Sequence, residues 1–135
     1  MTVDMRSFLQ QIKKTNDLFT VKKKVSTKYE IAAVTEKLDG SKAALFENVQ
    51  GSKFKLVSNL VGSRDRFAQA IGSKKSDINQ KIVKAISSAK KPKISTTAKF
   101  FENSSNDISI LPIVTHFQNE SGPFITSSIL YTKNL

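Results

Sequence analysis

Several residue types are missing or scarce in this chain of 135 residues, and each absence excludes a class of protein. The chain has no cysteine, no tryptophan and a single histidine, His116. Without cysteine there is no disulfide framework, no thiolate nucleophile and no cysteine metal site, and one histidine cannot form a multi-histidine metal site. A protein without cysteine fits a reducing compartment, so we expect a cytoplasmic location.

Long apolar runs and phosphate-binding loops are absent as well. No run approaches the roughly 18 apolar residues that cross a bilayer. Residues 1–14 alternate charged and apolar residues, unlike the continuous apolar core of a signal peptide. The five glycines form neither G-x-G-x-x-G nor a loop ending in G-K-[ST]. We therefore expect a soluble, unprocessed protein in which the glycines serve turns and helix ends.

The chain is strongly basic, with 22 Lys and Arg against 11 Asp and Glu and a formal net charge of +11. Its lysines cluster at 13–14, 22–24, 74–75 and 90–91. Gathered on one face, they would attract nucleic acid. No aromatic platform or arginine-rich helix accompanies them, so solvated lysines at the ends of elements are the better interpretation. A basic face that docks onto an acidic partner subunit is a third interpretation.

The hydrophobic pattern predicts a single α/β (α+β) domain over residues 1–135, with a mixed sheet flanked by helices. Helices are expected at 5–14, from a Ser26 cap to 39–40, from 63 to a stop at Gly72, and from a cap at Ser76 or Asp77 to 89. Strands are expected at 18–25, 43–49, 53–60, 108–117 and 124–132, the second and third paired, the last two joined by a turn at 118–122. Residues 93–107 read as an exposed connection. We expect one core, which contains Ile31, Leu45, Phe46, Phe54, Leu56, Phe67, Ile82, Ile113 and Ile125.

Candidate chemical groups are few. His116 lies in an apolar frame without an evident orienting partner, so a structural role is favoured over a general base. Glu120 is a weak candidate acid or metal ligand, and turn formation is favoured. Ser63 and Arg64 stand at a strand-to-helix junction, where backbone N–H groups and a guanidinium could hold an anion. The alternative is an N-cap serine beside a solvated arginine, which needs no ligand.

Four segments together resemble the amino-terminal region of the UbiD family of decarboxylases. They are ALFENVQG at 44–51, NLVGSRDR at 59–66, LPIVTHF at 111–117 and GPFIT at 122–126, and MRSFL at 5–9 and EIAAV at 30–34 fit as well. The segments fall in the family's order and at about its spacing. The resemblance implies the α/β fold of the UbiD amino-terminal domain, with the family's flavin-binding and carboxyl-terminal domains absent from these residues.

The resemblance also implies a chemistry. UbiD-like enzymes are carboxy-lyases that use prenylated flavin mononucleotide and a divalent metal to decarboxylate aromatic or unsaturated acids. It places Thr126 and Ser127 on a strand beside the flavin pocket of a complete enzyme. The family's main flavin, metal and catalytic segments have no counterpart in the 135 residues, so we assign no catalytic or metal-binding residue. We expect no cofactor in the isolated chain.

Two interpretations of function follow from the resemblance. The first is an amino-terminal domain or small subunit of a UbiD-like decarboxylase: a split subunit, a shortened paralogue or an isolated piece of a longer chain. Such a protein would be inactive alone and completed by a larger UbiD-like subunit or by self-association, with strand 124–131 as the expected docking surface. The second is a non-catalytic interaction or regulatory protein derived from that domain, and a nucleic-acid-binding module ranks below both.

Overall fold

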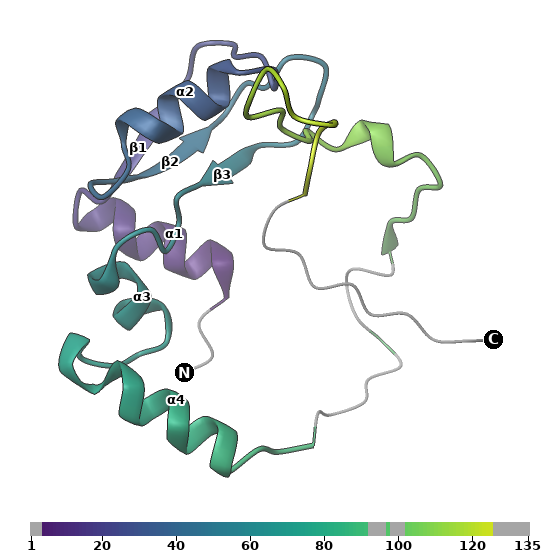
Figure 1. Cartoon of the computed structure of the whole chain (residues 1–135). Coiled ribbons are helices and arrows are strands. Elements are labelled where there is room, and N and C mark those ends of the chain that lie inside the picture. Colours follow the sequence, from purple (N-terminus) through teal and green to yellow (C-terminus); the bar gives the residue numbers. More distant parts are fainter. Residues whose placement is uncertain (1–3, 92–96, 98–101, 126–135) are drawn as a thin grey trace.

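A computed structural model describes residues 4–91, 97 and 102–125 (Figure 1). Its helices are α1 (Met5–Lys14), α2 (Glu30–Lys37), α3 (Arg64–Ala70) and α4 (Ile78–Ser87), with 3₁₀ turns η1 (Lys75–Asp77) and η3 (Ile108–Ile110). Its strands are β1 (Leu18–Val21), β2 (Ala43–Phe46) and β3 (Leu56–Ser58). In this part of the chain, no helix is both long and apolar enough to span a bilayer.

The three strands form one mixed sheet in the order β1-β2-β3. Strand β1 pairs with β2 in parallel, and β2 pairs with β3 in antiparallel orientation. The predicted α/β class with a mixed sheet is confirmed, as is the pairing of the second and third strands. Strand β2 is therefore central, and its two sheet faces both need cover.

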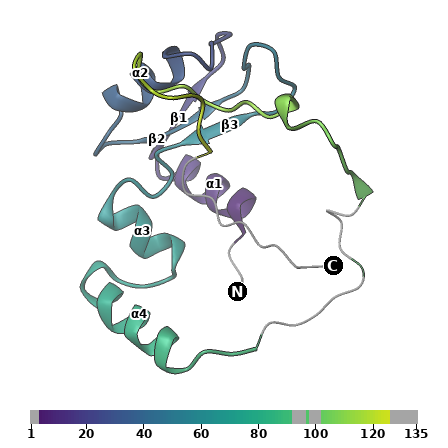
Figure 2. The same cartoon turned by 45° about the vertical axis from the view of Figure 1, so that its right-hand side comes forward.

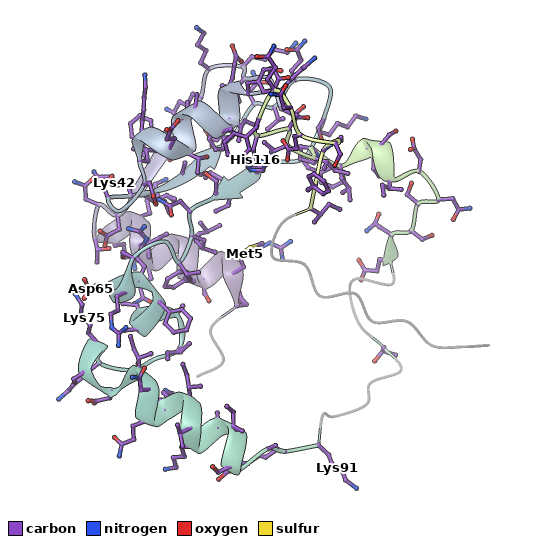
Figure 3. The ribbon with its side chains drawn as sticks, in the orientation of Figure 1. Met5, Lys42, Asp65, Lys75, Lys91 and His116 are labelled. Carbon is purple, nitrogen blue, oxygen red and sulfur yellow. The ribbon has the colours of Figure 1, made fainter. Side chains whose placement is uncertain are left out.

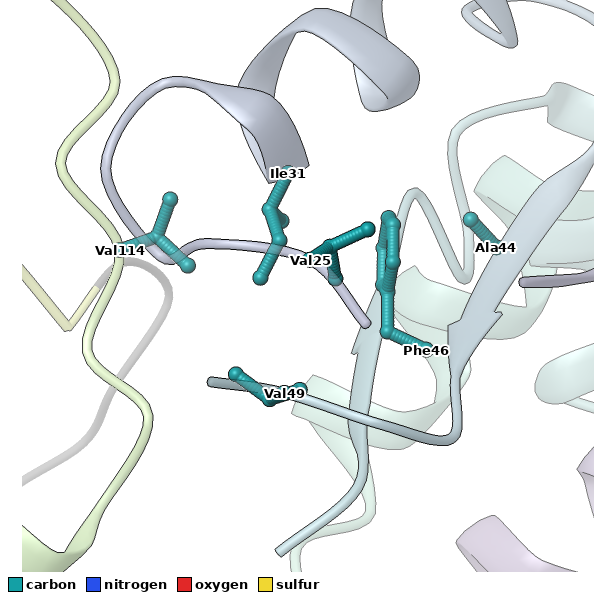
Figure 4. Packing of buried hydrophobic residues seen from close by; sticks show 6 residues of the cluster. All are labelled: Val25, Ile31, Ala44, Phe46, Val49 and Val114. Atoms are coloured by element: carbon teal, nitrogen blue, oxygen red, sulfur yellow. The ribbon is translucent and has the colours of Figure 1, made fainter. Parts of the chain in front are cut away.

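Alternation along β2 divides the core into two clusters. Ala44 and Phe46 point to the face covered by α2, where they pack with Val25, Ile31, Val49 and Val114 (Figure 4). Ala43 points the opposite way and joins Phe8 and Ile12 of α1 and Leu18. Because side chains alternate along a strand, a short run of four apolar residues supplies both clusters. The predicted single core is in fact two, separated by the sheet.

The expected core residues divide accordingly. Ile31 and Phe46 are buried, and Leu45, Leu56, Phe67 and Ile113 are half-buried. Phe54, Ile82 and Ile125 are exposed, so their assignment to the core was wrong. Phe54 precedes β3 in a turn, and Ile82 lies on a helix that the sheet does not cover. On β1, Phe19 is 47% exposed, and its neighbour Leu18 is buried.

The start of α2 differs from the prediction. Tyr29, not Ser26, is the N-cap residue, and its φ of 71° lies in the left-handed region. Glu30 N–H donates to the Lys28 carbonyl at 3.0 Å, which closes a tight turn around Tyr29. Ser26 lies three residues earlier, where its N–H donates to the Glu30 carboxylate. The turn begins the helix three residues later than a serine cap would have done.

The predicted strand 108–117 is not present as a strand. Residues Ile108–Ile110 form the 3₁₀ turn η3, and further along Thr115 makes a single parallel bridge to Lys28. Val114 is buried against the α2 face and makes an antiparallel bridge to Phe124. The predicted turn at 118–122 thus brings its two flanks, Val114 and Phe124, together. Pro112 has no N–H to donate to a neighbouring strand, and the flanking residues form single bridges only, so the segment does not extend the sheet. Most of the predicted strand 124–132 lies outside the described residues.

A buried arginine fixes α3 to the sheet. Arg66 is 2% exposed, and its guanidinium donates to the carbonyls of Ser41 at 2.6 Å and of Asn59 and Leu60 at 3.3 Å. These carbonyls lie just before β2 and just after β3. One side chain therefore ties two segments of the chain to the first turn of α3.

Asn59 and Gly62 complete this junction. Asn59 donates from its side-chain amide to the carbonyls of Leu38 at 3.2 Å and Lys42 at 3.0 Å. A Cβ on Gly62 would lie 1.5 Å from the Asn59 side-chain oxygen, a separation that no structure can hold. Glycine is therefore required at 62. Within the segment NLVGSRDR, Asn59, Gly62 and Arg66 therefore have structural roles.

We expect Phe46→Ala to lower the free energy of unfolding by ~3–5 kcal/mol, since it removes a fully buried ring from the central strand. Denaturant titration measures the loss. Phe19→Ala is the matched control, because Phe19 lies on the neighbouring strand with 47% of its surface exposed. A similar loss in both variants would contradict the two-cluster core.

We expect Arg66→Met to cost about 2–4 kcal/mol, because an unmet buried acceptor costs about 1–3 kcal/mol and three carbonyls lose their donor together. Arg66→Lys should recover part of this loss, since one amino group reaches fewer of the three acceptors. Arg64→Ala, an exposed position two residues earlier, should change stability by less than about 0.5 kcal/mol. Equal effects at 64 and 66 would show that the network contributes nothing.

Candidate functional site

His116, which is labelled in Figure 3, lies at the bend that follows Val114, and Glu120 lies beside it. The Glu120 carboxylate accepts backbone N–H groups of His116 at 2.5 Å and Phe117 at 2.9 Å. The hydrogen bond from Phe117, followed by that from His116, holds the pKa of Glu120 below its usual value. The carboxylate therefore serves the bend, as the turn interpretation predicted.

His116 is not arranged as a general base. Its Nδ1 lies 3.8 Å from the nearer Glu120 oxygen, too far for a hydrogen bond, and about a third of its side chain is exposed. The main chain around it is held firmly: Thr115 N–H donates to Thr27, and Thr115 accepts from Tyr29 N–H, each at 3.0 Å. This arrangement supports the structural interpretation of His116.

Acidification should loosen this bend. The folded pKa of Glu120 is depressed, so its contribution to stability is present above the unfolded pKa and is lost as the pH falls through the folded pKa. The bend positions Val114 in the core and Phe124 across from it. It is thus a structural support for the segment that leads to the last predicted strand.

Ser63 and Arg64 lie at the start of α3, as the sequence indicated. Ser63 is the N-cap residue, and its hydroxyl accepts the Arg66 N–H at 3.2 Å. Arg64 is exposed on the first turn. The cap accounts for Ser63 without any ligand, and an anion at this position stays a prediction. The other two predicted site residues, Thr126 and Ser127, lie outside the described residues.

Sequence reasoning missed a basic hollow at the start of α4. The hollow has a volume of about 600 Å³ and is lined by Gly72, Ser73, Lys74, Asp77, Gln80, Lys81 and Lys84. Lys81 Nζ donates to the Gly72 carbonyl at 2.7 Å, so one of the three ammonium groups is engaged in the fold. Gly72 ends α3 with a φ of 64°, which creates the concave turn. The lysine spacing at 81 and 84 was the available signal.

The described part of the chain contains no cluster of side chains that could bind a metal ion. There, no three of His, Asp or Glu gather closely enough to hold an ion. The hollow beside α4 is open, whereas a cofactor site buries most of its ligand. The described residues do not by themselves fit the family's flavin or metal.

Solved structures of UbiD-class enzymes share this fold. HmfF from Pelotomaculum thermopropionicum, in complex with FMN, superposes with a TM-score of 0.79 at 27% identity over 87% of this chain. An evolved dimeric form of HmfF with prFMN gives 0.74 at 26% identity over 87%. The chain spans 28% and 29% of these two enzymes.

A third match is the vanillic acid decarboxylase ShVdcCD of Sedimentibacter hydroxybenzoicus in open form, with truncated ShVdcD. It has a TM-score of 0.51 at 26% identity, over 61% of this chain and 18% of the other. No curated protein matches the sequence.

The sequence itself matches a family over more than half of its length. Residues 9–86 match the 3-octaprenyl-4-hydroxybenzoate carboxy-lyase N-terminal domain. This range begins in α1 and ends in α4, so it includes the whole sheet and the Arg66 junction. The chain belongs to the UbiD amino-terminal domain family.

Proposed function

We propose that this chain is the amino-terminal domain or small subunit of a UbiD-like carboxy-lyase that acts on aromatic or unsaturated acids. The observation that carries the proposal is the match of residues 9–86 to the carboxy-lyase domain, joined by the 0.79 superposition on HmfF. The chain corresponds to 28% of that enzyme. Residues 1–135 act as one structural domain, whose task is to complete a larger catalytic unit.

The chain alone is not a decarboxylase. Loss of carbon dioxide leaves a carbanion, which needs an electron sink such as a prenylated flavin. The 135 residues hold no counterpart of the family's main flavin, metal and catalytic segments, and the described side chains form no enclosed site that replaces them. In a complete enzyme, Thr126 and Ser127 would approach the flavin, and Ser63 and Arg64 would offer an anion contact.

A larger UbiD-like subunit is the natural partner in this proposal. The matched vanillic acid decarboxylase, ShVdcCD, contains a second component, ShVdcD, so relatives of this chain assemble from more than one component. Here, Phe124 and Ile125 begin the last predicted strand and are 50% and 53% exposed. Apolar residues on both faces of 124–131 need cover on both sides, which a partner chain supplies.

The alternative is a non-catalytic interaction or regulatory protein that retains the domain. It shares the fold and the exposed residues Phe124 and Ile125, but needs no flavin-bearing partner. The genomic neighbourhood separates the two, because a split enzyme requires an open reading frame for the remaining portion.

The isolated chain should purify without flavin and release no carbon dioxide from aromatic or unsaturated acids. Absorbance of the purified protein and a carbon dioxide assay measure the two properties. HmfF, whose structures contain FMN and prFMN, is the positive control treated in parallel. Stoichiometric flavin in this chain would overturn the assignment of an incomplete unit.

Co-expression with a neighbouring gene product that carries the missing UbiD portion should yield a stable complex with decarboxylase activity. Phe124→Asp and Ile129→Asp should each weaken that complex at least tenfold, which corresponds to about 1.4 kcal/mol of binding free energy. Phe19→Asp is the control, since Phe19 is similarly exposed on β1. The split-subunit proposal fails if no neighbour encodes that portion or if the two chains do not bind.

A further inference from the structure

The basic hollow beside α4 is formed by two parts of the chain. The turn that ends α3 supplies Gly72, Ser73 and Lys74, and the start of α4 supplies Asp77, Gln80, Lys81 and Lys84. Positions 77, 80, 81 and 84 follow the spacing i, i+3, i+4 and i+7, so they share one side of the helix. In both views, α3 and α4 lie together at the end of the domain farthest from α2 (Figures 1 and 2).

The hollow carries positive charge that the fold does not neutralise. Three lysines against one acid leave its lining with a formal charge of +2. Lys74 and Lys84 form no ion pair within the described residues, whereas the neighbouring Lys75 pairs with Asp65 at 2.9 Å on the surface (Figure 3). The ammonium group of Lys81 donates to a backbone carbonyl at 2.7 Å, which holds it in place without cancelling its charge. This excess of charge would attract an anion.

Ser73 supplies an unused hydrogen-bonding group to the same hollow. Its hydroxyl oxygen is buried and has no hydrogen-bond partner, and only one other side-chain atom among the described residues shares this property. That atom, Gln69 Oε1, belongs to α3 and does not line the hollow. Buried polar groups are nearly always hydrogen-bonded, so the Ser73 hydroxyl calls for a partner that the folded chain does not supply. A serine hydroxyl can donate one hydrogen bond, which an oxyanion accepts.

The first turn of α4 adds further donors. Asp77 is the N-cap residue of this ten-residue helix, but its side chain makes no capping hydrogen bond. The Asp77 carboxylate instead accepts the Ser76 hydroxyl at 2.5 Å. The backbone N–H groups of the first turn therefore have no side-chain cap, and the positive end of the helix dipole favours negative charge there.

We propose that this hollow binds a phosphate monoester of a small molecule. Such a group carries about −1.5 to −2 charges at neutral pH and three acceptor oxygens, which match the +2 lining and its several donors. The volume of about 600 Å³ is in the range of small-molecule sites, so a small organic group has room beside the phosphate. Ammonium groups, a free hydroxyl and a helix start together form the kind of surroundings that phosphate prefers.

Other anions fit the hollow less well. A carboxylate carries one charge and two oxygens, so it would leave part of the charge and some of the donors unmatched. A nucleic acid has one charge per phosphate and would extend over other lysine clusters, such as the exposed lysines at 22–24. A terminal phosphate group on a small molecule is the ligand that a concave, doubly positive site selects.

NMR titration of the isotope-labelled full chain tests the site, with inorganic phosphate and phenyl phosphate as probes at constant ionic strength. The backbone amide signals of residues 72–84 should shift and saturate, with a dissociation constant on the order of 1 mM for inorganic phosphate. Phenyl phosphate should bind at least as tightly, since the hollow has room for its ring. A short single-stranded oligonucleotide is titrated in parallel.

Variants of the charged residues should change the affinity in opposite directions. Lys74→Gln/Lys84→Gln removes two of the three ammonium groups and should raise the dissociation constant for phosphate about tenfold or more. Asp77→Asn should lower it, because this variant removes the single negative charge of the lining and no capping bond is lost. Lys23→Gln/Lys24→Gln makes the same charge change at two exposed lysines outside the hollow and should leave the affinity unchanged.

A variant of Ser73 separates binding from folding. Ser73→Ala should raise the dissociation constant about threefold, because the ligand loses one hydrogen bond. It should leave the thermal unfolding temperature unchanged or slightly higher, since the hydroxyl has no partner in the fold. A merely structural serine would instead lower the unfolding temperature and leave the affinity for phosphate as it is.

Three results would overturn the inference: shifts that do not saturate, shifts spread equally over residues 22–24, or unchanged affinity in Lys74→Gln/Lys84→Gln. Binding of the oligonucleotide without binding of either phosphate would identify a nucleic-acid contact and would overturn it as well. None of these measurements involves flavin or carbon dioxide. The inference therefore stands or falls independently of the proposed decarboxylase role.

Discussion

The guanidinium of Arg66 is the constraint on which the arrangement of this domain depends. A buried cation is costly unless its hydrogen-bonding capacity is met, and here three backbone carbonyls meet it. Those carbonyls come from the ends of β3 and the approach to β2, so α3 cannot shift without exposing them. Asn59 extends the same network to the end of α2. Arg66 and Asn59 thus hold β2, β3, α2 and α3 together at one corner of the domain.

The Arg66 junction gives most polar residues of the segment NLVGSRDR a structural role. In NLVGSRDR, Asn59 has a φ of 54° and its side chain donates to two carbonyls. Gly62 has no Cβ and so does not clash with the Asn59 side chain, and Ser63 is the N-cap of α3. Each polar residue except the exposed Arg64 and Asp65 has a partner inside the fold, and Asp65 pairs with Lys75 at the surface. A motif that keeps a family's fold need not keep its chemistry.

Local sequence patterns predicted the early helices and strands well. Contacts between distant segments decided where α2 begins and which side chains are buried. The stripe Phe8, Leu9 and Ile12 gave α1 with its observed bounds, and the apolar run at 43–46 gave the central strand. The Tyr29 turn displaced the predicted Ser26 cap, because the chain bends there to meet Thr115. Arg66 could not be recognised as buried, since arginine is mostly exposed and its three acceptors are backbone atoms without a sequence signature. The periodicity of α4 correctly predicted a helix, but Ile82, which was expected in the core, is 38% exposed, and Ile78 is the residue of this helix that is buried.

Charge is distributed unevenly along the chain, and the fold neutralises little of it. Within the described residues, lysines form two ion pairs with carboxylates, Lys55 with Glu47 and Lys75 with Asp65, and all four side chains are at least one-third exposed. Surface pairs of this kind contribute little to stability. A net charge of +11 on one small domain leaves it with unfavourable self-repulsion, which is strongest where lysines are dense and acids are sparse. Helix α4 carries both features, but on different sides, since Lys81 and Lys84 line the hollow and Ile82, Val83 and Ile86 lie away from it. Repulsion among the lysines and exposure of the apolar stripe are therefore two separate costs on this helix, and a contact that covers one side leaves the other unchanged.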